Sequence, residues 1–160
     1  DSNCRTVSGI ISMTRTDPLL TVLKLATAAE DQAALQLKSA QFEKQKRQGQ
    51  LDALNNYRLD YMKQMEGHTG TTLRANQYHQ FHQFIRQVDS AITQQVAAVK
   101  DAEKQVGYRQ IHWQEKQQKR KAVEMLLSQK ATKAMVIEAK REQKMSDEFA
   151  MQQYFRRNLK

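Results

Sequence analysis

Apolar residues recur along almost the whole chain at alternating steps of four and three, and this spacing restricts the fold more than any other feature. Such a repeat places one apolar stripe along an α-helix, as in coiled coils. In the first half of the chain, ten of the fourteen positions in this series are apolar. The series is Leu19, Leu23, Ala26, Glu30, Ala33, Leu37, Ala40, Lys44, Arg47, Leu51, Leu54, Arg58, Tyr61 and Met65.

The second half of the chain shows the same spacing, without a proline and with Gly107 as its only glycine after residue 78. Good helix formers dominate the composition, which predicts long helices. The second series is Phe81, Ile85, Val88, Ile92, Gln95, Val99, Ala102, Val106, Arg109, Trp113, Lys116, Arg120, Val123 and Leu127, continued by Ala134, Ile137, Met151 and Phe155.

The ends of the two helical stretches are also marked. Asp17 followed by Pro18 is a helix-start signal, because aspartate caps the first turn and proline suits its first position. Gly67 and Gly70 lie three residues apart and favour the end of a helix. Since one apolar stripe needs another to cover it, we predict an all-α fold, a long antiparallel two-helix coiled coil. We expect a single domain over 17–160, with arm one at about 18–66, a bend at about 67–77 and arm two at about 78–156.

The register of the two arms follows from the aromatic residues beside the bend. Antiparallel pairing of Tyr61 with Phe84, Tyr57 with Val88 and Leu54 with Ala91 keeps the sum of residue numbers at 145. The same register brings the small Ala33 to within one residue of the large Trp113, which suits a narrow seam. Residues beyond about 128 then have no partner in the chain, and this overhang is basic. Its cations are Lys130, Lys133, Lys140, Arg141, Lys144, Arg156 and Arg157.

The net charge of +9 favours nucleic acid, an anionic membrane surface or an acidic protein as partner. No apolar run approaches the roughly 20 residues of a membrane span, and no secretory signal is evident. The single Cys4 excludes an internal disulfide and fits a reducing cytoplasm. Residues 1–16 lack the helical repeat. We expect them to be either a disordered native tail or a leader foreign to the native chain, and in the second case the natural start would be Met13.

Metal binding and catalysis find little support. His79 and His82 share a helix face and His68 lies nearby, but zinc prefers four ligands and no cysteine is close. We expect these histidines to be solvated groups beside the bend that bind no metal. Nucleophile and phosphate-binding motifs are missing, so we predict no enzyme, no cofactor and no small-molecule substrate. Tyr78, Phe81 and Phe84 have helix-edge spacing, which favours core or partner contact over base stacking.

Four segments, in this order and spacing, resemble the FliJ family of flagellar type III export proteins. They are DPLLTVLKLA, LDALNNYRLDYMKQM, NQYHQFHQFIRQVDSAI and QKMSDEFAMQQ, and the resemblance covers roughly residues 13–155. The most specific part is the pair of aromatic groups on either side of the glycine-containing bend. Members of this family are cytoplasmic two-helix coiled coils similar to the central stalk of rotary ATPases.

The resemblance implies a non-enzymatic stalk that inserts into the hexameric export ATPase ring. It also implies binding to the cytoplasmic domain of the export gate and to export chaperones, and a place at the inner face of the membrane held through these partners. The gate contact carries over to Gln50, Leu54, Tyr57, Tyr61, Phe84, Val88, Ala91 and Gln95, where Gln95 stands in place of the family's histidine. Tyr57 and Phe84 lie one position outside the seam, so we expect them to form contacts rather than core.

Contact with the ATPase ring is predicted from the basic residues of arm two, of which the run KQQKRK at 116–121 is the densest. A solvated helix face is the other reading of this run. The predicted ring contacts are Lys116, Lys119, Arg120, Lys130, Lys133, Lys140 and Arg141. Three alternatives for the whole chain stay open: the stalk of a virulence type III secretion system, a basic coiled coil that binds nucleic acid, and a scaffold that self-associates through the overhang.

Overall fold

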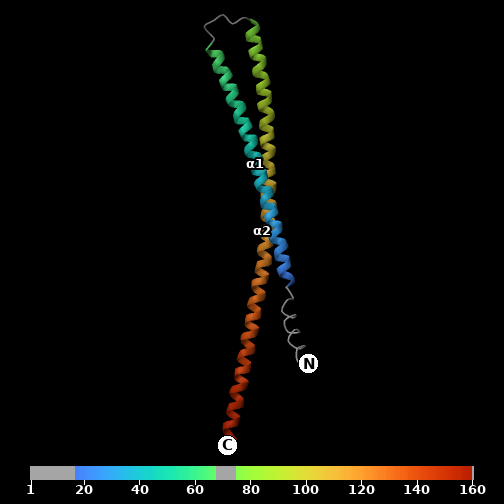
Figure 1. Ribbon diagram of the computed structural model, residues 1–160, viewed down its shortest axis with the longest axis vertical. Helices are drawn as coiled ribbons and strands as arrows, with labels where there is room; N and C mark the ends of the chain where they lie inside the picture. Colours follow the sequence, from blue (N-terminus) through green and yellow to red (C-terminus); the bar gives the residue numbers. More distant parts are fainter. Residues whose placement is uncertain (1–16, 68–74, 160) are drawn as a thin grey trace, which may run out of the picture. The chain divides into compact units, whose positions relative to one another are not determined.

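The computed structural model describes residues 17–67 and 75–159, and these residues form two α-helices (Figure 1). Helix α1 spans Pro18–Glu66 and helix α2 spans Ala75–Asn158. No strand occurs in the described ranges, so the predicted all-α fold is confirmed. Arm one was expected over 18–66, the range of α1, whereas α2 begins three residues before the expected residue 78. The predicted leader and most of the predicted bend, including Gly70, lie outside the described residues.

Helix α1 begins where the sequence signal places it. The carboxylate of Asp17 accepts a hydrogen bond from the backbone amide of Leu19 at 3.1 Å, and its carbonyl accepts one from Leu20 at 2.9 Å. The first amides of a helix lack partners within it, so this cap satisfies one of them. At the other end, the amide of Gly67 donates to the carbonyl of Lys63 at 3.2 Å. Helix α1 therefore ends at Glu66, one residue before Gly67.

Packing contacts divide the described residues into two compact units. One of them, which we call the hairpin unit, is Glu30–Lys116. It contains the C-terminal part of α1 and the N-terminal part of α2. Here α1 and α2 run antiparallel (Figure 1). Three cross-helix contacts fix their register: Gln36 with Arg109 at 3.0 Å, Gln50 with Gln95 at 3.2 Å, and the rings of Tyr61 and Phe84 at 4.3 Å. In each pair the residue numbers sum to 145, so the predicted register is confirmed.

The apolar seam is covered as its spacing predicts. All fourteen α1 positions of the series are buried or half-buried, each within its own unit. On α2 the same holds from Phe81 to Leu127, with Arg109 as the one exposed position. The most buried side chains are small, since Ala33 is 1% exposed and Ala102 is 2% exposed. Small residues let two helix backbones approach closely, while Trp113 is half-buried at the level of Ala33.

Two polar residues inside the seam of the hairpin unit, Arg47 and Gln95, bond to backbone groups of the opposite helix. The guanidinium of Arg47 donates to the carbonyl oxygen of Ala98 at 2.9 Å, and the amide of Gln95 donates to the carbonyl oxygen of Arg47 at 2.9 Å. Arg47 also pairs with Glu43 one turn away, at 3.0 Å. Because a buried polar group without a partner is costly, these bonds make a polar layer tolerable in a helix pair.

The second unit, called the terminal unit, comprises the described residues 17–29 and 117–159. Ala26 and Val123 are its buried apolar side chains. Lys130 reaches back to the start of α1, where its ammonium group lies 2.7 Å from a carboxylate oxygen of Asp17. From Ala131 to Leu159 every side chain is exposed. The overhang expected beyond about residue 128 therefore exists, although Lys130 within it has a partner, Asp17. Over the described ranges, neither helix has a stretch apolar enough to cross a membrane.

Candidate partner-binding surfaces

An aromatic cluster joins the two helices near the bend side of the hairpin unit. The rings of Tyr61 and Phe84 are 4.3 Å apart, Tyr61 stacks on Phe81 at 5.4 Å, and Tyr57 meets Phe84 edge-on at 6.0 Å. Tyr61 and Phe81 belong to the seam series, whereas Tyr57 and Phe84 lie one position outside it. The register thus brings seam and edge rings of both helices into one group.

This cluster is only partly covered. Tyr57 is 56% exposed, and Tyr61 and Phe84 are half-buried. Tyr57 lies outside the core, as expected, while Phe84 is shared between core and surface because it packs on Tyr61. Half-covered aromatic rings on a rigid support are common anchors of protein interfaces, since they bury large area at little entropic cost. The cluster is therefore a candidate binding surface.

The eight residues predicted for the gate contact all lie in the hairpin unit, four on each helix. Val88 is the one buried residue among these eight, because it is only 7% exposed and packs in the seam. Its contribution would be support of the neighbouring rings. We refer to the other seven as the aromatic patch: Gln50 and Tyr57, which are exposed, and Leu54, Tyr61, Phe84, Ala91 and Gln95, which are half-buried.

The expectation for the histidines beside the bend is partly wrong. His79 is exposed, but His82 is half-buried between the rings of Tyr78, at 4.3 Å, and Phe81, at 5.5 Å. Its Nε2 atom is buried and has no hydrogen-bond partner among the described residues. His82 is thus part of the packing beside the aromatic patch, because one helical turn places it against Tyr78. The described ranges hold no group of three metal-ligand side chains, and His68 lies outside them.

The residues predicted for the ring contact differ in their surroundings. Lys116 is half-buried in the hairpin unit, and Arg120 is half-buried in the terminal unit, where it pairs with Glu124 at 2.8 Å. Lys130 pairs with Asp17. The other four are exposed side chains of the terminal unit: Lys119, Lys133, Lys140 and Arg141.

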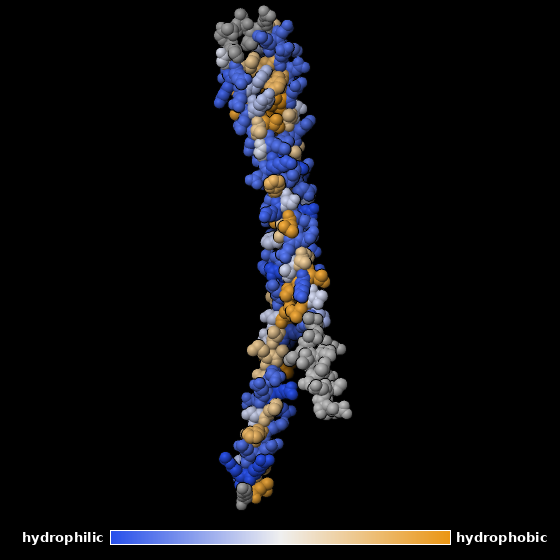
Figure 2. Space-filling view, in the orientation of Figure 1, coloured by the Kyte–Doolittle hydropathy of each residue, from blue (hydrophilic) through white to orange (hydrophobic). Residues whose placement is uncertain are grey.

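The uncovered part of α2 also exposes many large apolar side chains, interspersed with basic ones (Figure 2). The seam positions Ile137, Met151 and Phe155 are among them, with exposures of 67%, 60% and 58%. Uncovered apolar surface of this extent is typical of a site that another protein covers. The remaining large apolar residues here are Met135, Val136, Met145, Phe149, Tyr154 and Leu159.

The Asp17 carboxylate predicts a pH-dependent start of α1. The hydrogen bond from Lys130, and after it the bond from the Leu19 amide, lowers the pKa of Asp17 below its ordinary value of 3.8. A depressed pKa means that the ionised cap stabilises the folded state above the unfolded pKa and is lost as pH falls through the folded one. We expect amide exchange at Leu19 to stay slow at neutral pH and to accelerate, relative to the unstructured rate, only below about pH 3.8.

Two variants separate the roles of this carboxylate. Asp17→Ala removes both the cap and the ion pair, so Leu19 should lose protection at neutral pH. Asp17→Asn keeps a good capping side chain and should retain protection at Leu19 while losing the pairing with Lys130. Equal protection in Asp17→Ala and the wild type would contradict the role of Asp17 as the cap.

Sequence reasoning missed one feature of the hairpin unit. Phe81 was expected in core or partner contact, and it is half-buried in the seam, where it stacks on Tyr61. Arg109 was also placed in the seam, but it is exposed and hydrogen-bonded to Gln36 across the helices. The polarity of Arg109 at an apolar position was the available signal.

Comparison with known proteins places these surfaces in a family context. A family model described as "Flagellar FliJ protein" matches residues 15–159. Among curated proteins, a flagellar FliJ protein of Escherichia coli K12 is 27% identical over 139 residues, which covers 87% of this chain and 95% of the relative. A flagellar FliJ protein of Salmonella typhi has the same identity and coverage. The similarity thus includes both helices and both candidate surfaces.

Proposed function

This chain belongs to the flagellar FliJ family, whose model matches it over residues 15–159, and on this premise we propose that it is a component of the flagellar type III protein export apparatus. It acts without catalysis, as a cytoplasmic stalk between the export ATPase ring and the export gate. It also binds export chaperones. Its role is thus in flagellum assembly and motility. The observation that carries the proposal is the aromatic patch, shared by both helices and half-covered.

The two candidate surfaces suit two partners of different chemistry. The patch offers rigid aromatic anchors with a polar rim, which fits the folded cytoplasmic domain of the gate protein. The uncovered part of α2 combines apolar seam positions with cations, which fits acidic ring loops around an apolar lining. There the charges would speed and orient association more than they would add affinity. The protein would reach the inner face of the membrane through the gate.

The test of the patch is the double variant Tyr57→Ala with Phe84→Ala. Truncating an interface anchor costs about 2 kcal/mol or more, so binding to the gate's cytoplasmic domain should fall at least about thirtyfold. Because Tyr57 is exposed and Phe84 half-buried, the helical content and the melting temperature should stay near those of the wild type. Binding is measured by calorimetric titration and folding by circular dichroism.

A matched control lies in the same unit. Phe42 and Tyr108 are 68% and 63% exposed, on other faces of the helices, and Phe42→Ala with Tyr108→Ala removes the same two ring types. This control should bind the gate domain as the wild type does. If the two double variants bind alike, the patch is not the gate contact, and if the Tyr57 and Phe84 variant unfolds, those rings are core.

A further inference from the structure

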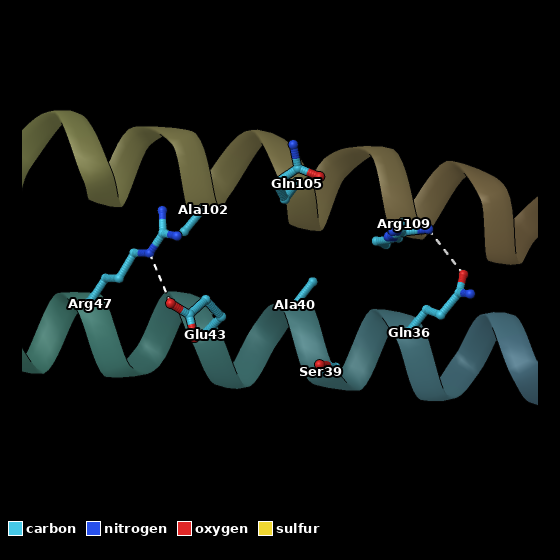
Figure 3. Close-up of a pocket in the computed structure, with 8 residues that line it drawn as sticks. All are labelled: Gln36, Ser39, Ala40, Glu43, Arg47, Ala102, Gln105 and Arg109. Carbon is cyan, nitrogen blue, oxygen red and sulfur yellow. Dashed lines mark hydrogen bonds and ion pairs between the residues drawn. The ribbon is translucent and has the colours of Figure 1, made fainter.

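A groove lies between the two helices of the hairpin unit, farther from the bend than the aromatic patch (Figure 3). Its volume is about 350 Å³. Its floor is made of small residues, Ala40 and Ala102, and Arg47 and Arg109 stand at its two ends. Each helix contributes one seam alanine to this floor, and the short side chains leave the space above them open. The remaining lining residues are Gln36, Ser39, Glu43 and Gln105.

The groove and the aromatic patch lie on the same edge of the helix pair. On each helix, this edge is formed by one position of the seven-residue repeat, the position directly before a seam residue. It is occupied by Tyr57 on α1 and by Phe84 on α2. Tyr57 and Phe84 meet there near the bend. Gln36, Glu43 and Gln105 have the same place in the repeat and line the groove. A single partner segment can therefore contact both features.

The charge of the groove indicates what such a segment carries. Arg47 already pairs with Glu43 and with the carbonyl of Ala98. Arg109 is exposed, and its hydrogen bond goes to the neutral amide oxygen of Gln36 at 3.0 Å. The guanidinium charge of Arg109 is thus not offset by that bond. A carboxylate is the group that a guanidinium binds best, through two parallel hydrogen bonds.

We propose that the partner bound at the aromatic patch continues along this edge as an acidic, amphipathic α-helix. A carboxylate of this helix would pair with Arg109, and a small apolar side chain would fill the space over Ala40 and Ala102. From Phe84 to Arg109 the path along α2 is about 37 Å, so the partner helix needs about 25 residues. The inference rests on the proposed function, because it takes the gate's cytoplasmic region as the source of this helix.

The experiment measures binding of the gate's cytoplasmic domain to full-length variants that alter only the groove. Arg109→Glu reverses the charge, and Gln105→Trp fills the space with an indole ring. Each should weaken binding by about tenfold, and the defect of Arg109→Glu should shrink as salt rises. The matched controls are Lys104→Glu and Gln110→Trp, exposed positions of the same two turns that do not line the groove. Both controls should bind normally.

A labelling measurement gives an independent readout. In a Cys4→Ser background, Gln105→Cys should react with a maleimide in the free protein and be protected by the gate domain, whereas Gln110→Cys should react in both states. The inference is overturned if Gln105→Cys stays reactive in the complex, or if Arg109→Glu and Gln105→Trp bind like the wild type. In that case a loss of binding in the Tyr57 and Phe84 double variant would leave the proposed function standing. Unchanged binding in both sets of variants would overturn the two together.

Discussion

Deletion of residues 128–160 is expected to abolish binding to the export ATPase while leaving the paired helices folded. The deleted segment contains the side chains from Ala131 to Leu159, all of them exposed. It supplies none of the residues buried in the seam, the last of which is Val123. The apolar seam positions Ile137, Met151 and Phe155 are removed together with most of the predicted ring contacts, so the loss should exceed that of any single substitution.

The deletion is checked with three measurements on one protein. Pull-down with the export ATPase should fail, titration with the gate's cytoplasmic domain should match the wild type, and the melting temperature should change by no more than a few degrees. The change should be small because the ion pair of Lys130 with Asp17, which the deletion removes, is exposed to solvent. Retained ATPase binding would show that this segment is not the ring contact, and a large fall in melting temperature would show that it supports the fold.

Ala33→Asp is expected to have the largest effect on stability. Ala33 is 1% exposed in the seam, at the level of the half-buried Trp113. A carboxylate there would be taken out of water at a point where the helices are too close to admit a longer side chain, at a cost of about 3 kcal/mol. Folded domains have stabilities of only about 5–15 kcal/mol, so the midpoint of urea unfolding should fall steeply.

The control is the neighbouring residue. Ala34→Asp makes the same substitution on the same turn of α1, but Ala34 is exposed. Both variants pay the same small loss of helix propensity, so the difference between their unfolding free energies isolates the burial. Similar unfolding of the two variants would mean that Ala33 does not lie in a packed seam.

The fold was predictable because one repeat determines most of it. A stripe of apolar residues at steps of four and three specifies which side of each helix is covered, and two antiparallel stripes with glycines between them have few other ways to pair. The choice of Tyr61 opposite Phe84 then set the register, and contacts as distant as Gln36 with Arg109 follow it. Because the repeat continues without interruption, one register holds along the whole hairpin unit.

The surfaces were less predictable, because the repeat specifies the helix face on which a residue lies but not the contacts of its side chain. Arg109 is exposed and hydrogen-bonded to Gln36, and the half-buried His82 packs against the ring of Tyr78 one turn away. The ring of Phe84 contacts the rings of both Tyr61 and Tyr57. Such outcomes are decided by neighbouring side chains at the edge of the seam, where several rotamers compete.

Arg47 and Gln95 each donate a hydrogen bond to a backbone carbonyl of the opposite helix, and these bonds have a mechanical consequence. If one helix of the hairpin unit slid past the other by seven residues, the apolar stripes would still match. Gln95 would then face Glu43 or Tyr57 in place of Gln50, and Arg109 would lose Gln36. Polar groups within a coiled coil disfavour such alternative alignments. A pull applied to one helix would therefore be passed to its neighbour without slippage.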